Sequence, residues 1–254
     1  MSQVDKAAAF AALHVPGKPV VIYNIWDAGS ARAVAGAGAK AIATGSWSVA
    51  EAQGYPDGEN LPLDTLLAVA TRIADSTDLP VSIDFEGGYA ADPEPLAKNI
   101  TALIATGAIG LNFEDQVVGG DGLYPLDTQV ERIKAVRAAA EAAGVPLFIN
   151  ARTDLFLKNK SDAHGDHMAE ALDRAAAYAE AGGSGFFIPG LSDPDMIARV
   201  CDAASLPVNV MMRGKLSSVS DVAALGVARA SYGPGPFANA MTQAAEGYAA
   251  AAAS

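Results

Sequence analysis

Acidic side chains stand at the ends of short apolar runs in this sequence. Asp84 and Glu86 close the run VSIDFE, and Glu114 closes the next such run, IGLNFE. Residues two apart in an extended strand point to the same side, so the carboxylates of Asp84 and Glu86 are expected to repel each other. Glu114, from a neighbouring strand, is expected to add to this repulsion. A divalent cation relieves such repulsion, and oxygen ligands favour Mg²⁺ or Mn²⁺ over zinc. We therefore predict a metal site formed by Asp84, Glu86 and Glu114.

The alternative is that these acids form structural ion pairs with Arg152 or with lysines. Arg152 follows the run PLFINA, and one arginine cannot balance three carboxylates. Its fork of N–H groups suits a substrate carboxylate instead. The small-residue turn TGSWS, which contains Ser46 and Trp47, exposes backbone N–H groups that can hold the same kind of anion. We predict an anion site from these parts.

Two loops could bring further groups to the site. Asp57 lies in GYPDGE, which by composition is a simple Pro-Asp-Gly turn but could also supply a base. The stretch from Gln116 to Pro125 contains three glycines and is a candidate mobile lid, with Tyr124 as its obvious proton donor. Tyr23, in the first apolar run, and Asn209, in the seventh, are predicted as substrate contacts.

The elements that must position these residues alternate between two kinds. Eight apolar runs are expected to be strands: 20–25, 40–45, 81–86, 109–114, 146–151, 185–190, 207–212 and 227–232. Ala-rich stretches with helical spacing separate most of them, and eight strand-helix units close most simply into a (β/α)₈ TIM barrel, whose active site lies at the carboxyl ends of the strands. A doubly wound open sheet is the alternative. We expect residues 1–254 to form one domain, ending in a helical tail over about 234–254.

The composition restricts the partners. The 254 residues carry a formal net charge of −12, which argues against nucleic acid and anionic membranes as partners. One cysteine allows no intramolecular disulfide, which fits a cytoplasmic setting, and no stretch is long and apolar enough to span a bilayer. The expected partner is a small-molecule carboxylate substrate.

Three motifs taken together, VSIDFEGG, GLNFED and INARTD, resemble the isocitrate lyase and phosphoenolpyruvate mutase superfamily. The resemblance implies that Asp84 ligates Mg²⁺ and also contacts the substrate, with Glu86 and Glu114 helping to hold the ion and its waters. It implies that backbone groups of Ser46 and Trp47 hold the substrate carboxylate, that Arg152 binds the substrate, and that Asp57 lies in the site. It also implies a homodimer or homotetramer in which the final helix is exchanged between subunits.

The candidate lid departs from the family pattern. The family's isocitrate and methylisocitrate lyases carry a Lys-Lys-Cys-Gly-His kind of motif there, and its phosphonate enzymes carry Lys and Asn, but residues 116–125 contain none of Lys, Cys and Asn. The shared chemistry that remains is a metal-stabilised enolate of a 2-oxo acid. We therefore expect an Mg²⁺-dependent lyase that cleaves a C–C bond or decarboxylates an oxaloacetate-like acid, with Asp57, Glu114 or Tyr124 as the base.

Three other interpretations remain open. The first is phosphonopyruvate or phosphoenolpyruvate chemistry at a C–P bond. The second is a binder of 2-oxo acids that has lost catalysis together with the lid residues. The third, a Schiff-base aldolase, requires an inward lysine at a strand end, and the eight runs supply none.

Overall fold

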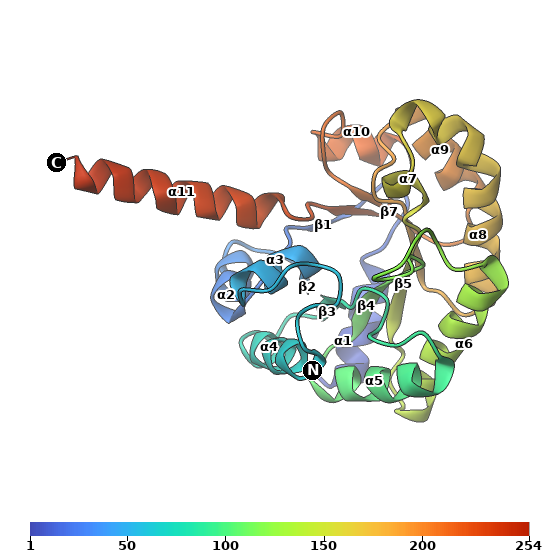
Figure 1. Ribbon diagram of the computed structural model, residues 1–254, viewed down its shortest axis with the longest axis horizontal. Helices are drawn as coiled ribbons and strands as arrows, with labels where there is room; N and C mark the ends of the chain where they lie inside the picture. The colour runs from blue at the N-terminus through green and yellow to red at the C-terminus, as the bar shows by residue number, and fades with distance from the viewer. Residues whose placement is uncertain (254) are drawn as a thin grey trace.

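Eight short parallel strands form the centre of the molecule, as the eight apolar runs predict (Figure 1). The computed structural model describes residues 1–253. The strands are β1 (Val20–Ile22), β2 (Ile42–Ala43), β3 (Val81–Asp84), β4 (Gly110–Glu114), β5 (Phe148–Arg152), β6 (Gly185–Phe187), β7 (Val208–Met211) and β8 (Arg229–Ser231). The residues of β3 and β4 are buried throughout, because a barrel strand faces side chains within and helices outside.

The order of the strands identifies a (β/α)₈ barrel and excludes the doubly wound sheet. Each strand pairs in parallel with its sequence neighbour from β2 through β8, and β8 also pairs with β1. A parallel bridge between Ile25 and Thr44 closes the remaining gap. Asn24 reinforces this closure, since its Nδ2 donates to Thr44 O at 2.8 Å while its Oδ1 accepts from the N–H groups of Tyr232 and Gly233 at 3.0 and 2.9 Å.

Helices surround the strands (Figure 1). They are α1 (Gln3–Ala12), α2 (Ala28–Gly36), α3 (Ser46–Ala52), α4 (Leu63–Asp75), α5 (Pro93–Ala105), α6 (Leu126–Ala142), α7 (Leu155–Lys158), η1 (Ser161–His167), α8 (Met168–Glu180), α9 (Pro194–Ala203), α10 (Val219–Ala224) and α11 (Gly235–Ala252). Several begin at side-chain caps, such as Asp27 before α2 and Asp193 before α9, which accept hydrogen bonds from otherwise free N–H groups of the first turn. None of the helices in residues 1–253 combines the length and hydropathy that crossing a bilayer requires.

Helix α1 closes the amino-terminal end of the barrel. Phe10 is fully buried there and packs edge-on against Phe148 of β5, with 5.2 Å between ring centroids. His14, just after α1, stacks on Phe148 at 4.1 Å. This apolar plug leaves the carboxyl ends of the strands as the open end of the barrel.

Helix α11 projects away from the barrel (Figure 1). Pro236 and Phe237 are its buried residues, and Phe237 packs edge-on against Trp26 and Trp47 at 5.1 and 5.5 Å. Met241 and Tyr248 are exposed beyond that anchor. The tail predicted over about 234–254 is therefore a helix over Gly235–Ala252, with its buried residues in the first turn and with Ser254 outside the described residues. Its exchange between subunits stays a prediction.

Candidate active site

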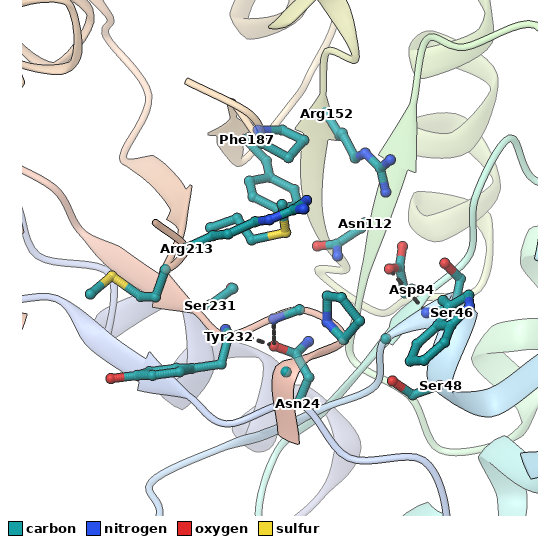
Figure 2. Close-up of a pocket in the computed structure, with 18 of the residues that line it drawn as sticks. Asn24, Ser46, Ser48, Asp84, Asn112, Arg152, Phe187, Arg213, Ser231 and Tyr232 are labelled. Atoms are coloured by element: carbon teal, nitrogen blue, oxygen red, sulfur yellow. Dashed lines mark hydrogen bonds between the residues drawn. The ribbon is translucent and has the colours of Figure 1, made fainter. Parts of the chain in front are cut away.

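A cavity of about 540 Å³ opens at the carboxyl ends of the strands. Predicted residues that line it are Ser46, Trp47, Asp57, Asp84 and Arg152. Figure 2 shows Asp84 and Ser46 on one side of this cavity and Phe187 and Arg213 on the other. The register explains the grouping, because parallel pairing sets Asp84 beside Asn112 and Arg152 beside both Glu114 and Phe187.

Asp84 ends β3 and is the acid at the floor of the cavity. Its Oδ2 accepts a hydrogen bond from Ser46 N–H at 3.2 Å, while the Thr44 hydroxyl accepts from the main-chain N–H of Asp84 at 2.8 Å. Its other oxygen, Oδ1, is buried and has no hydrogen-bond partner. A buried carboxylate oxygen without a partner is costly, so Asp84 is held ready for a cation or a donor from a ligand.

Glu86 lies behind the cavity lining, where it is 6% exposed. Its Oε2 accepts a hydrogen bond from Glu59 N–H at 2.8 Å. Burial, followed by the negative charges of Asp57 and Asp84, raises the pKa of Glu86 to about 8. The repulsion between acids that the sequence predicted is thus present around Asp84.

Glu114 and Arg152 form a buried ion pair across neighbouring strands. Arg152 Nη1 lies 3.0 Å from Glu114 Oε2, and the same guanidinium holds both oxygens of Asp154 at 2.5 and 2.9 Å. Burial raises the pKa of Glu114 well above its usual value, although Arg152 acts in the opposite direction. Arg152 is therefore largely engaged by two protein carboxylates, and less of its fork is free for a substrate than the sequence suggested.

Asp115, the residue after Glu114, has a structural role. Its carboxylate is fully buried and accepts hydrogen bonds from Tyr178 Oη at 2.7 Å, Arg174 Nη1 at 3.2 Å and Asp154 N–H at 2.9 Å. Consecutive residues of a strand point to opposite faces, so Glu114 turns toward the site and Asp115 away from it. Asp115 thereby fixes Asp154, which in turn orients Arg152.

Asp57 reaches the cavity from the loop after α3. It lines the cavity although it is exposed to solvent. Partial desolvation and then the charge of Asp84 raise the pKa of Asp57, while the Ser46 hydroxyl lowers it. The structure thus brings Asp57 to Asp84, as the family resemblance implied and the turn-like composition did not.

Besides Glu86 and Glu114, three further predicted residues do not line the cavity. The ring of Tyr124 lies over the Arg132 guanidinium at 4.2 Å, so this side chain points away from the proposed chemistry. Tyr23 is 43% exposed and packs on Tyr232. Asn209 is buried in the barrel, where its Oδ1 accepts from the Ser231 hydroxyl at 3.1 Å. Their predicted roles as proton donor and substrate contacts therefore receive no support from this geometry.

The acids fit a divalent cation with few protein ligands. Within residues 1–253, no three acidic, histidine or cysteine side chains are arranged to chelate an ion together. The two glutamates of the predicted metal set are turned to other partners, Glu86 to the Glu59 N–H and Glu114 to Arg152. Asp84 Oδ1 remains free, and Mg²⁺ commonly uses one or two carboxylates and keeps several waters. Direct ligation by Asp84 suits this geometry, whereas the glutamates could act only through waters.

Arg213 lines the cavity and was missed by the sequence reasoning. It is the second residue after β7, which ends at Met211. The sequence signal is its place just past the carboxyl end of a strand, where barrel side chains face the site. A cationic side chain at this position indicates a site residue as strongly as an acidic one does.

The family model described as phosphoenolpyruvate phosphomutase matches residues 10–252. That range spans the whole barrel, from α1 to the last turn of α11. The chain belongs to the phosphoenolpyruvate mutase and isocitrate lyase superfamily. The expected family membership is therefore confirmed, and the members that resemble this chain are enzymes with several activities.

The relatives of this superfamily member differ in reaction. A solved structure from Burkholderia cenocepacia J2315, whose assignment as a phosphonomutase is provisional, superposes with a TM-score of 0.94 at 46% identity, over 96% of this chain and 98% of that one. The 2-methylisocitrate lyase of Escherichia coli is 31% identical over 92% of this chain and 83% of its own length. An oxaloacetate decarboxylase of Bradyrhizobium is 31% identical over 75% of this chain and 65% of its own length.

Proposed function

We propose that this protein is an Mg²⁺-dependent lyase that acts on a small 2-oxo or 2-hydroxy carboxylic acid, by C–C cleavage or decarboxylation through an enolate. The observation that carries the proposal is the unpartnered Oδ1 of Asp84 at the floor of a cavity surrounded by acids. When bound there, Mg²⁺ would supply a Lewis acid that polarises the 2-oxo group. The cytoplasm is the expected compartment, since a single, half-buried cysteine requires no oxidising environment.

Asp84 would hold the ion, and its orientation is already fixed. The hydrogen bond from Ser46 N–H occupies Oδ2 and leaves Oδ1 without a partner. Ser46 and Trp47 line the cavity beside it and would receive the carboxylate of the substrate. A 2-oxo acid would thus be bound both at its 2-oxo oxygen, through the ion, and at its carboxylate.

The acids near Arg152, Asp57 and Glu114, are the candidates for proton transfer. Asp57 lines the cavity and has a raised pKa, so it can accept a proton from a substrate hydroxyl more readily than an ordinary aspartate. Glu114 is held by Arg152 at 3.0 Å and lies behind the lining. We therefore assign the base to Asp57 and assign to Glu114 and Arg152 the task of fixing the geometry.

Decarboxylation of an oxaloacetate-like acid is the reaction that this site needs least help to perform. Loss of CO₂ requires stabilisation of developing negative charge but no strong acid from the lid. Tyr124 is turned to Arg132, which leaves the lid without a proton donor at the cavity. The likeness to an oxaloacetate decarboxylase supports this choice, and the likeness to a provisional phosphonomutase favours C–P chemistry as the second candidate.

The experiment is proton and phosphorus NMR of the purified protein with Mg²⁺ and a panel of substrates. The panel contains oxaloacetate, 2-methylisocitrate, dimethylmalate, phosphonopyruvate and 2-oxoglutarate, each run against EDTA and a protein-free blank. We expect metal-dependent loss of oxaloacetate above the blank. Conversion of phosphonopyruvate alone would establish the second candidate, and Mg²⁺-dependent binding without conversion would indicate a non-catalytic binder.

A further inference from the structure

A second cavity, of about 420 Å³, adjoins the first. The two share three lining residues, Leu157, Met211 and Arg213. These three residues therefore stand where the two cavities adjoin. Because Arg213 and Asp84 both line the first cavity, a ligand bound at Asp84 faces Arg213 within that cavity.

The two cavities differ in the charge of their linings. The first cavity has Asp57 and Asp84 in its lining, whereas none of the described residues that line the second is acidic. The second cavity is bounded by apolar and neutral polar side chains together with Arg213 and His164. Nε2 of His164 lies 2.9 Å from Phe156 O and 3.2 Å from Asn159 O, so this histidine is tied to the protein backbone. Arg213 gives the lining of the second cavity its permanent positive charge.

Arg213 is the cation that remains available to a ligand. Of the described residues that line the first cavity, two are basic, Arg152 and Arg213. Arg152 is neutralised by Glu114 and Asp154, whereas the guanidinium of Arg213 has no ion pair or hydrogen bond within residues 1–253. In a chain of net charge −12, an unpaired arginine facing a cavity is suited to an anion that arrives with the ligand.

The backbone of Arg213 is anchored even though its side chain is free. Met212, just before it, is buried and donates its N–H to Ser231 O at 2.7 Å. Leu216, three residues after it, is also buried, and its N–H donates to Arg213 O at 3.1 Å, which closes a tight turn. Gly214 allows this turn with a φ of +59°. The guanidinium is therefore presented from a fixed point on the Phe187 side of the cavity, across from Asp84 (Figure 2).

We propose that Arg213 binds a second carboxylate of the substrate, remote from the 2-oxo acid end held at Asp84. This inference rests on the proposed function and narrows it, because the substrate class becomes 2-oxo or 2-hydroxy dicarboxylic acids. Arg213 is then a specificity-determining residue that separates diacids from monoacids of the same length. A bidentate Arg–carboxylate pair contributes both affinity and orientation.

The test is Mg²⁺-dependent binding, measured by titration calorimetry, of acids that differ only in the distal group. The pairs are 2-oxoglutarate against 2-oxopentanoate and 2-oxoadipate against 2-oxohexanoate, with oxalate as the probe of the Asp84 end alone. We expect the wild type to prefer the diacid of at least one pair by about tenfold to a hundredfold, the range for a hydrogen bond to a charged group. Arg213→Gln is expected to abolish that preference while oxalate still binds, and Arg213→Lys to retain part of it.

Lys215→Gln is the matched control, because Lys215 is exposed, lies in the same turn and lines neither cavity. It should leave the preference for diacids unchanged. Wild-type protein that binds oxalate but does not discriminate between diacids and monoacids at either length would overturn the Arg213 inference and leave the proposed function standing. Absence of binding to oxalate and to every 2-oxo acid would overturn both.

A phosphonopyruvate arm separates a carboxylate from a phosphonate. Binding of phosphonopyruvate that depends on Arg213, with no such dependence for either diacid, would contradict the assignment to a carboxylate. Binding of a diacid that depends on Arg213 supports the assignment, whether or not the binding of phosphonopyruvate also depends on Arg213.

Discussion

The main-chain N–H of Glu59 donates a hydrogen bond to Glu86 Oε2 at 2.8 Å, and so ties the loop that carries Asp57 to the end of β3. The Glu59 carboxylate accepts in turn from Tyr89 N–H at 2.8 Å. Glu59, Glu86 and Tyr89 have φ values of 56°, 50° and 57°, and they are the non-glycine residues of the described chain with positive φ. Such backbone conformations are unfavourable and persist where surrounding contacts hold them. This network therefore sets the position of Asp57 relative to Asp84.

Removal of the Glu59 carboxylate is expected to loosen that loop. Glu59→Ala removes the acceptor for Tyr89 N–H, and we expect kcat/KM for the preferred substrate to fall about tenfold, the equivalent of one hydrogen bond. Glu59→Gln keeps an acceptor oxygen and should retain most of the activity. Hydrogen exchange of peptides covering 54–60 and 86–90 checks the cause, since both should lose protection in the alanine variant alone. Equal activity in the two variants would contradict a positioning role.

The ion pair between Glu114 and Arg152 should be important for stability as well as for the site. Arg152→Gln leaves Glu114 and Asp154 buried without their cation, and we expect a loss of about 3–5 kcal/mol in the free energy of unfolding. Urea denaturation measures it. The exposed pair of Lys98 and Glu94 provides the control, because Lys98→Gln should cost less than about 1 kcal/mol. Equal losses at the two positions would refute this reading of the buried pair.

The low pKa of buried His14 leads us to expect that the free energy of unfolding decreases in acid. Burial, together with the nearby Arg229 charge, lowers its pKa to about 3 from 6.5. The folded state then binds fewer protons than the unfolded state, so stability is full above about pH 6.5 and falls as the pH decreases toward 3. Between pH 7 and pH 5 this amounts to about 2 kcal/mol, at 1.36 kcal/mol per pH unit. In His14→Gln that part of the pH dependence should be absent, and an unchanged difference between the two pH values would show that His14 is not its source.

Helix α11 predicts an oligomer. Most of its described residues beyond Phe237 are exposed to solvent, and Tyr248 is 77% exposed. We propose a homodimer or homotetramer in which α11 packs on a neighbouring subunit, and we expect light scattering to give a mass of two or four chains. Deletion of residues 239–254, which keeps the Phe237 anchor, should lower that mass while the barrel remains folded. A monomeric full-length protein would contradict the proposal.

The fold was predictable because its signals are local. Each of the eight runs contains one strand, and β5 extends to Arg152, one residue past the run that predicts it. Strand order follows from the short connections and the handedness of β/α units. The closure through Ile25 and Thr44 was not predictable, because it is a single bridge set by tertiary packing.

The site was predictable where strands present the side chains and less so where loops do. Asp84 and Arg152 stand at strand ends and line the cavity as expected. Tyr124 lies in a glycine-containing loop whose direction the sequence does not set, and its ring packs on Arg132 instead. The partners of Glu86 and Glu114 were not predictable either. Their contacts with Glu59 N–H and with Arg152 depend on distances that the spacing of residues in the sequence does not give.

The most direct test of the metal site is binding of Mn²⁺, as a paramagnetic substitute for Mg²⁺, followed by electron paramagnetic resonance in the presence and absence of oxalate. We predict that wild-type protein binds the ion, that oxalate strengthens binding, and that Asp84→Asn weakens it at least a hundredfold together with all turnover. The control Asp78→Asn removes an exposed acid remote from the cavity lining and should behave as wild type. Unchanged Mn²⁺ affinity and turnover in Asp84→Asn would contradict the assignment of Asp84 as the metal ligand and with it the proposed mechanism.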